Sequence, residues 1–276
     1  MTAGILFFGR TVPKRQETKK QISSSAGQPV STLSEISIDS IISLAKRQIT
    51  DEQAARISML ENSISRGNIV DQKLKLYQQL ADFWGDTMRF FLPFVWYRAE
   101  AARLENSEKS LTFAAHLILE NLQHEEDSRI IRWEALQARD LFERSLMINP
   151  SNDSARVGLG ACYLFGNISP GPLEGVKKIL EVIDRDSTHS YALITLAKGS
   201  LISGQTEKAI ERLMSINRHH PENLEAILML ADIYERKAEN KLAADWYRKS
   251  LMYIARPDAR TEIEKRILEL TSKQSQ

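Results

Sequence analysis

The segment Leu224-Glu-Ala-Ile-Leu-Met-Leu-Ala-Asp-Ile-Tyr234 carries the clearest structural signal in this chain. Its apolar residues recur every three or four positions, as in a helix that buries one face: Ile227, Leu230, Ala231 and Tyr234. A polar turn at 238–241 separates this helix from a second stripe that includes Ala243 and Tyr247. Two helices joined by a short turn pack antiparallel, so the segment predicts a helical hairpin.

This hairpin is one copy of a repeat. The segment that starts 34 residues earlier, at 190, has the same chemistry, with Leu193 and Ala197 in its first helix and Gly204 at its turn. When extra residues are allowed in two of the turns, the pattern continues toward the N-terminus and predicts five units: 74–107, 108–152, 153–189, 190–223 and 224–257. A general helical bundle is the competing interpretation, but a bundle does not require a regular period.

Three units depart from the regular pattern. The unit 153–189 has extra residues in Asn167-Ile-Ser-Pro-Gly-Pro172, where two prolines and a glycine suit a turn. The unit 108–152 contains an insertion around 124–131, which we interpret as an inserted turn. The unit 74–107 is degenerate, because Pro93 stands where a small residue is usual and is tolerable only near a helix start.

One run of residues points to a known repeat family. Phe142, Pro150, Leu159, Gly160 and Tyr163 appear in the order of the tetratricopeptide repeat (TPR), whose units of about 34 residues have Leu-Gly, Tyr, an aromatic residue and a closing Pro at such places. The chain therefore resembles the TPR family, in its bacterial type. The resemblance implies an all-α, right-handed solenoid of antiparallel helix pairs, whose first helices line a concave groove that binds a partner. No single unit can bury its apolar face alone, so the pairs must stack.

Further helices are expected on both sides of the repeats. Residues 32–73 carry two helical patterns, and Thr50 with Gln53 three positions later predicts a capping box at the start of the second. After the repeats, Pro257 opens a last helix, and the segment 258–276 has the polar outer face that caps an open solenoid.

The first 31 residues differ from the rest of the chain. An apolar run of seven residues, Ala3-Gly-Ile-Leu-Phe-Phe-Gly9, precedes basic residues and a stretch rich in Ser, Gln and Gly. The default interpretation of 1–31 is a disordered basic tail, because it has too few apolar groups to offset its ordering entropy. The alternative is the end of a membrane-spanning helix, since seven residues cannot cross a bilayer alone. We expect a cytoplasmic protein whose only membrane association would be through this N-terminus.

Composition and motifs argue against catalysis. The 37 Lys and Arg residues balance 36 Asp and Glu residues, so the chain has no overall field for nucleic acid and no such partner is expected. The single cysteine, Cys162, is interpreted as a small buried residue. His219, His220 and the segment 124–127 lack the ligand number that a metal needs, and Gly158-Leu-Gly160 lies within a helical stripe, where it serves packing. No catalytic residue, metal or cofactor is expected.

The resemblance makes the groove the expected binding site for a protein or peptide. Its residues are those opposite the packing stripe of each first helix: Val157, Ala161, Leu164, Tyr191, Ile194, Lys198, Leu201, Glu225, Leu228, Asp232 and Glu235. This series changes from apolar to acidic along the chain. We therefore expect the groove to bind a partner segment with an apolar centre and a basic end. The chain would then be a non-catalytic interaction scaffold or, as the alternative, a membrane-tethered assembly or stress-response factor that uses the same solenoid. An enzyme with a pocket in the solenoid is the least favoured alternative.

Overall fold

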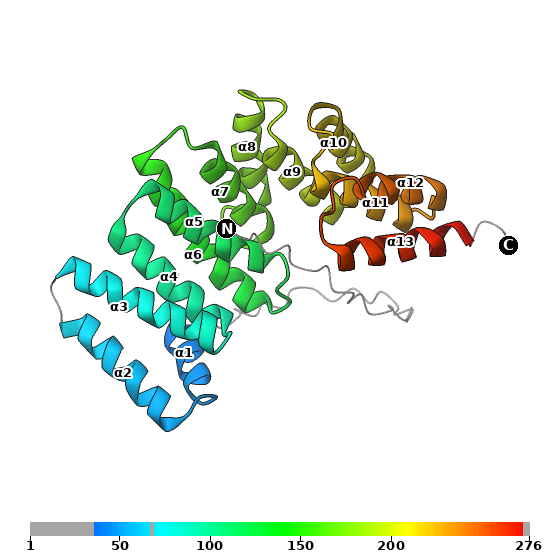
Figure 1. Ribbon diagram of the computed structural model, residues 1–276. Helices are drawn as coiled ribbons and strands as arrows, with labels where there is room; N and C mark the ends of the chain where they lie inside the picture. The colour runs from blue at the N-terminus through cyan, green and yellow to red at the C-terminus, as the bar shows by residue number, and fades with distance from the viewer. Residues whose placement is uncertain (1–35, 67–68, 273–276) are drawn as a thin grey trace, which may run out of the picture. The chain divides into compact units, whose positions relative to one another are not determined.

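The computed structural model describes residues 36–66 and 69–272, and all of the regular structure in these ranges is helical (Figure 1). Contacts divide the chain into Met1–Leu33 and a helical unit, Ser34–Gln276. The elements of the helical unit follow one another as α1 (Ile38–Lys46), α2 (Asp51–Arg66), α3 (Val70–Asp82), η1 (Phe83–Thr87), α4 (Phe91–Glu105), α5 (Glu108–Leu122), α6 (Ser128–Ile148), α7 (Asp153–Phe165), α8 (Pro172–Ile183), α9 (Ser190–Ile202), α10 (Thr206–His219), α11 (Leu224–Arg236), α12 (Asn240–Ser250) and α13 (Pro257–Ser272).

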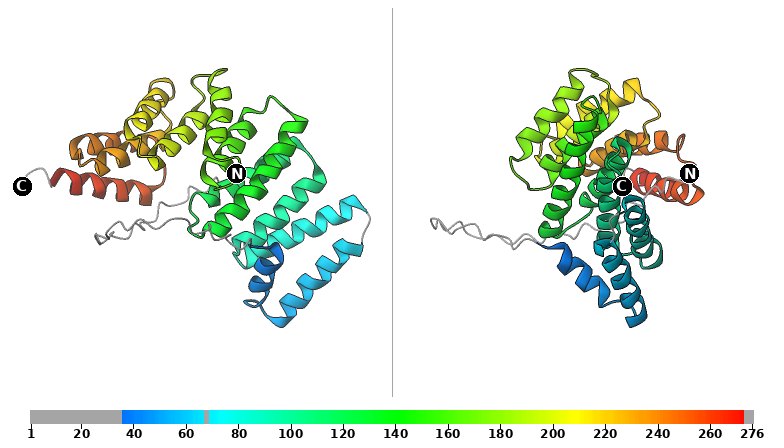
Figure 2. Two further views of the ribbon diagram at one scale, coloured as in Figure 1. Left: turned by 180° about the vertical axis from the view of Figure 1, so that it is seen from behind. Right: turned by 90° about the vertical axis from the view of Figure 1, so that its left-hand side faces the viewer.

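Consecutive helices pack in pairs. The pairs are α3 with α4, α5 with α6, α7 with α8, α9 with α10, and α11 with α12, and each second helix also contacts the first helix of the next pair. The first helices of neighbouring pairs touch as well, α5 against α7 and α7 against α9. Both views in Figure 2 show the pairs following one another in chain order. Stacked antiparallel pairs of this kind form an α-solenoid, which confirms the expected fold class.

Asparagine side chains set the start of two first helices. Asn152 Oδ1 accepts a hydrogen bond from the Ala155 backbone N–H at 2.8 Å, and Asn223 Oδ1 accepts one from Ala226 at 2.9 Å. Each asparagine therefore satisfies a backbone donor that the first turn of a helix leaves unpaired. Because the two residues stand at the same place in their repeats, they begin α7 and α11 in the same register.

Several local expectations are confirmed. Thr50 and Gln53 form a reciprocal capping box, with backbone-to-side-chain distances of 3.0 and 3.2 Å. Pro93 is the third residue of α4, close enough to the helix start that its missing N–H costs no internal hydrogen bond. Pro257 is the first residue of α13, and Cys162 is fully buried.

The insertion at 124–131 is not a turn over its whole length. Helix α6 begins at Ser128, because the Asp127 carboxylate caps it by accepting the Arg129 backbone N–H at 2.8 Å. Residues 128–131 therefore belong to a helix of 21 residues, and the connection itself is short. The unit predicted at 74–107 also differs at its start, since α3 begins at Val70 and continues into the π-helical turn η1.

Part of the sequence-based prediction lies outside the described residues. The apolar run at 3–9 and the basic tail that follows belong to the undescribed segment 1–35, as does the start of the predicted range 32–73. Within 36–66 and 69–272, no helix combines the length and the apolar character needed to cross a membrane.

Candidate protein-binding face

The predicted groove residues lie on α7, α9 and α11, the first helices of three consecutive pairs. Helix α7 contacts α9 directly, and a salt bridge joins α9 to α11. The predicted groove residues therefore lie on three helices that are joined to one another by direct contacts. We call the following set the inner face: Val157, Ala161, Leu164, Tyr191, Ile194, Lys198, Leu201, Glu225, Leu228, Asp232 and Glu235.

Three apolar members of the inner face are closed off from solvent. The side chains of Val157, Ala161 and Ile194 are 0%, 1% and 5% exposed. The half-buried Leu164 lies against α9, where one of its methyl carbons is 2.7 Å from the place that a Cβ on Gly199 would take. Side chains buried as deeply as Val157, Ala161 and Ile194 have no surface to offer a partner. The apolar centre expected from the sequence is therefore part of the protein's own core.

Three aromatic rings, those of His116, Phe142 and Tyr191, pack together beside these buried side chains. The His116 ring, on α5, lies 5.4 Å from the Tyr191 ring and 5.0 Å from the Phe142 ring, edge-on to both. Its Nε2 is 2.8 Å from Ser154 Oγ on α7. Burial lowers the pKa of His116 to about 4, so the imidazole is neutral near pH 7. Burial is also the main cause that raises the pKa of Tyr191.

Sequence reasoning missed His116 as part of this region. Its signal was positional, because His116 stands on α5 at the place in the repeat that Ala161 and Lys198 occupy on α7 and α9. An irregular unit hid that correspondence, since the residues inserted after α5 shift the spacing. His116 therefore belongs to the inner side of the solenoid as a packing group between helices.

Lys198 links three helices. Its ammonium lies 2.8 Å from Gln123 Oε1 at the end of α5 and 2.8 Å from Glu225 Oε1 on α11. The contact with Gln123 reaches across the intervening pair α7 and α8, so Lys198 links the inner side of the solenoid over three pairs. Because its charge is satisfied by Glu225, neither residue presents an unpaired charge to a partner.

The acidic end of the inner face is also partly neutralised. Glu235 pairs with Arg266 of α13 through two hydrogen bonds, one of them 2.9 Å long from Arg266 Nε to Glu235 Oε2. The Tyr247 hydroxyl, on α12, lies 2.6 Å from Asp232 Oδ1 and 3.1 Å from Glu235 Oε2. Burial first, and then the Asp232 carboxylate, raise the pKa of Tyr247. Asp232 is the one inner-face carboxylate that forms no ion pair within the described part of the chain.

The remaining residues of the inner face are partly accessible. Tyr191, Leu201 and Leu228 are half-buried, and Glu225 is exposed. At the end of α9, Ile202 follows Leu201 and is 75% exposed, although the sequence pattern did not single it out. The accessible part of the inner face is therefore formed by the end of α9 and by α11.

The described residues contain no group of three or more His, Cys, Asp or Glu side chains placed to hold a metal ion. His219 is exposed, with its Nδ1 2.9 Å from the Ser215 carbonyl oxygen one helical turn away. Gly158 and Gly160 are buried within α7 at contacts with other helices, which confirms their packing role.

The repeated hairpins and the contacts between their first helices define the architecture. The chain is a TPR-like α-solenoid. No protein-family model matches the chain. It is 28% identical over 114 residues to an Arabidopsis thaliana protein described as "Protein CTR9 homolog"; the match covers 40% of this chain and 10% of that protein's length.

Solved structures with a similar arrangement include a MamA fragment from Desulfovibrio magneticus RS-1, which is 20% identical to this chain with a TM-score of 0.40. That match covers 65% of this chain and 94% of the fragment. Another is YrrB, described as a TPR protein with an unusual peptide-binding site, at 13% identity and a TM-score of 0.37, covering 69% of this chain and 91% of YrrB. The TPR-like description of the chain rests on its own repeat spacing and helix pairing.

Proposed function

We propose that this TPR-like chain is a non-catalytic interaction scaffold that binds a segment of a partner protein along the end of α9 and the accessible side of α11. The observation that carries the proposal is the charge balance of α11. Glu225 and Glu235 are each paired with a cation from another helix, whereas Asp232 forms no ion pair with any residue that the structure describes. One uncompensated carboxylate beside apolar surface suits a ligand with one cation beside an apolar side chain.

The neighbouring residues define what such a partner segment would contact. Leu201 and Leu228 are half-buried and offer apolar surface on α9 and α11. Tyr247 holds Asp232 in position through its 2.6 Å hydrogen bond, so the carboxylate needs little ordering when it pairs with a ligand. A partner segment with an apolar anchor and a nearby Lys or Arg fits both features. Apolar contact would supply most of the affinity, and the charge pair would set the register.

The test is a quantitative pull-down from native lysate with the full chain and two variants. Asp232→Asn removes the charge but keeps an oxygen that can accept the Tyr247 hydrogen bond. Glu211→Gln is the matched control, because Glu211 is an exposed carboxylate on the second helix α10. Both variants should show the circular dichroism spectrum and the melting temperature of the parent chain before binding is compared.

We expect the partner to be retained by Glu211→Gln and to bind Asp232→Asn with about 1 kcal/mol less free energy, roughly fivefold weaker. The difference between the parent chain and Asp232→Asn should shrink as salt is raised from 50 to about 500 mM, because salt screens an exposed ion pair. Equal retention of every partner by Asp232→Asn at low salt would show that α11 is not the binding surface.

A further inference from the structure

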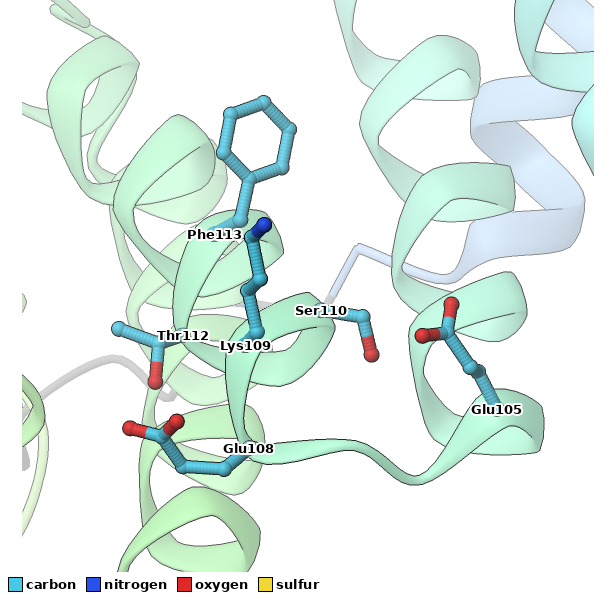
Figure 3. Close-up of a pocket in the computed structure, with 6 residues that line it drawn as sticks. All are labelled: Glu105, Glu108, Lys109, Ser110, Thr112 and Phe113. Carbon is cyan, nitrogen blue, oxygen red and sulfur yellow. The ribbon is translucent and has the colours of Figure 1, made fainter.

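A shallow pocket of about 590 Å³ opens at the start of α5, outside the inner face (Figure 3). Helix α4 contributes its last residue to the pocket wall, and α5 contributes the others. In Figure 3, Phe113 and Lys109 project from α5 in the same direction, while Glu105 stands on the neighbouring helix. The residues that line the pocket are Glu105, Glu108, Lys109, Ser110, Thr112 and Phe113.

The pocket combines an exposed ring with carboxylates that have no cation partner among the described residues. Phe113 is 62% exposed and is the one aromatic residue among the large exposed apolar side chains of the described ranges. Glu105 accepts a hydrogen bond from Ser107 Oγ at 2.9 Å, and Glu108 accepts one from Asn152 Nδ2. Neither carboxylate forms an ion pair with any residue that the structure describes. With Lys109 at the same rim, the pocket carries one net negative charge.

We propose that this pocket binds an arginine side chain presented by a partner protein. An arginine has a flat cationic group and an aliphatic stem, and the pocket offers a complement to each. The guanidinium stacks on the accessible face of Phe113, where the ring attracts a cation, and donates hydrogen bonds to Glu105 at the rim. Its single positive charge balances the net charge of the pocket. The aliphatic stem contacts the carbon chain of Lys109, which projects from α5 beside Phe113.

The geometry favours arginine over lysine. A guanidinium is planar and more weakly hydrated than an ammonium, so it stacks on a ring and binds a carboxylate through two parallel hydrogen bonds. The pocket is open, and an ammonium there would keep most of its water and gain little. The arginine pocket is independent of the site around Asp232, because the two sites lie on α5 and α11 and share no residue.

The experiment is a titration of the ¹⁵N-labelled full chain followed by TROSY NMR, with three small probes of known chemistry. The probes are the N-acetyl methylamides of arginine, lysine and citrulline, of which citrulline has nearly the shape of arginine without the charge. We expect arginine amide to shift the backbone signals of 105–113 in a saturable way, with a dissociation constant at least fivefold lower than those of the other two probes.

Two variants test the residues, and two more serve as controls. Phe113→Ala and Glu105→Gln should each weaken arginine-amide binding at least threefold. Leu173→Ala, which removes an apolar side chain that is 87% exposed, and Glu120→Gln, an exposed carboxylate on α5 itself, should leave it unchanged. Absence of saturable shifts at 105–113, equal affinity for citrulline or lysine amide, or undiminished binding by Phe113→Ala would each overturn the proposal.

Discussion

Gly160 on α7 and Gly175 on α8 meet backbone to backbone: a Cβ on Gly160 would stand 2.8 Å from the Gly175 carbonyl oxygen and 2.6 Å from Ile179 Cγ1. A backbone oxygen cannot rotate away as a side chain can. Any side chain at Gly160 would therefore push α7 and α8 apart along their whole contact.

The first prediction follows from this contact. Gly160→Ala should lower the free energy of unfolding by about 1–3 kcal/mol through overpacking, in spite of alanine's higher helix propensity. Gly199→Ala is the control, because the three nearest atoms to a Cβ there all belong to the Leu164 side chain, which can move. Urea denaturation of both variants checks the prediction, and a Gly199→Ala variant that loses as much stability as Gly160→Ala would contradict it.

The second prediction concerns a carboxylate buried between α5 and α6. Glu134 is 0% exposed, accepts a hydrogen bond from Asn121 at 2.7 Å through Oε1, and has no partner for Oε2 among the described residues. Burial raises the pKa of Glu134 to about 8, partly opposed by the Asn121 hydrogen bond and assisted by the charge of Glu125. The native protein therefore holds a proton there that the unfolded chain releases near pH 4.5.

Because the native pKa of Glu134 is the higher one, stability falls as pH rises from about 4.5 to about 8. The Gln side chain of Glu134→Gln cannot ionise. Between pH 5 and pH 8 this variant should therefore lose about 1–3 kcal/mol less unfolding free energy than the parent chain. Paired urea denaturations at the two pH values measure this difference. Glu120→Gln, on the exposed side of α5, is the control, and an identical pH dependence for Glu134→Gln and the parent chain would refute the prediction.

The third prediction has the opposite sign and concerns His116. Its pKa is lowered to about 4 by burial, whereas the unfolded chain takes up the proton near pH 6.5. The stability that the neutral His116 contributes is therefore fully present above about pH 6.5 and is lost as the pH falls toward 4. His116→Asn should lose less stability than the parent chain between pH 7.5 and pH 5. Melting temperatures at both pH values check this, and His219→Asn, at an exposed position, should match the parent chain.

The fourth prediction concerns the hydroxyl that positions Asp232. Tyr247 is a buried side chain, and its hydroxyl donates to the Asp232 carboxylate. Tyr247→Phe should lower the free energy of unfolding by about 1.5–3 kcal/mol, which is typical of a hydrogen bond to a charged group. Tyr253→Phe, on a tyrosine whose side chain forms no hydrogen bond with the described residues, should cost less than about 0.5 kcal/mol. Equal losses in chemical denaturation would show that the hydroxyl contributes nothing to stability.

Much of the fold could be predicted because its signals are local. A helix that buries one face shows its period within a dozen residues, and Thr50, Gln53 and Pro257 act on the turn to which they belong. The interpretation of 124–131 as a turn was wrong because it, too, used only local signals. Its charged residues look like a loop when taken alone, whereas Asp127 caps a helix that packing against α5 continues.

The sequence by itself determined the repeat, the alternation of first and second helices and the places where small residues let helices approach. These properties depend on neighbours a few residues away or one period away. Only the tertiary structure decided which inner-face residues are accessible. Val157, Ala161 and Ile194 are covered by packing, while Gln123 and Arg266 reach Lys198 and Glu235 from distant helices. Accessibility and charge pairing depend on side chains brought together by folding, and no local pattern encodes those contacts.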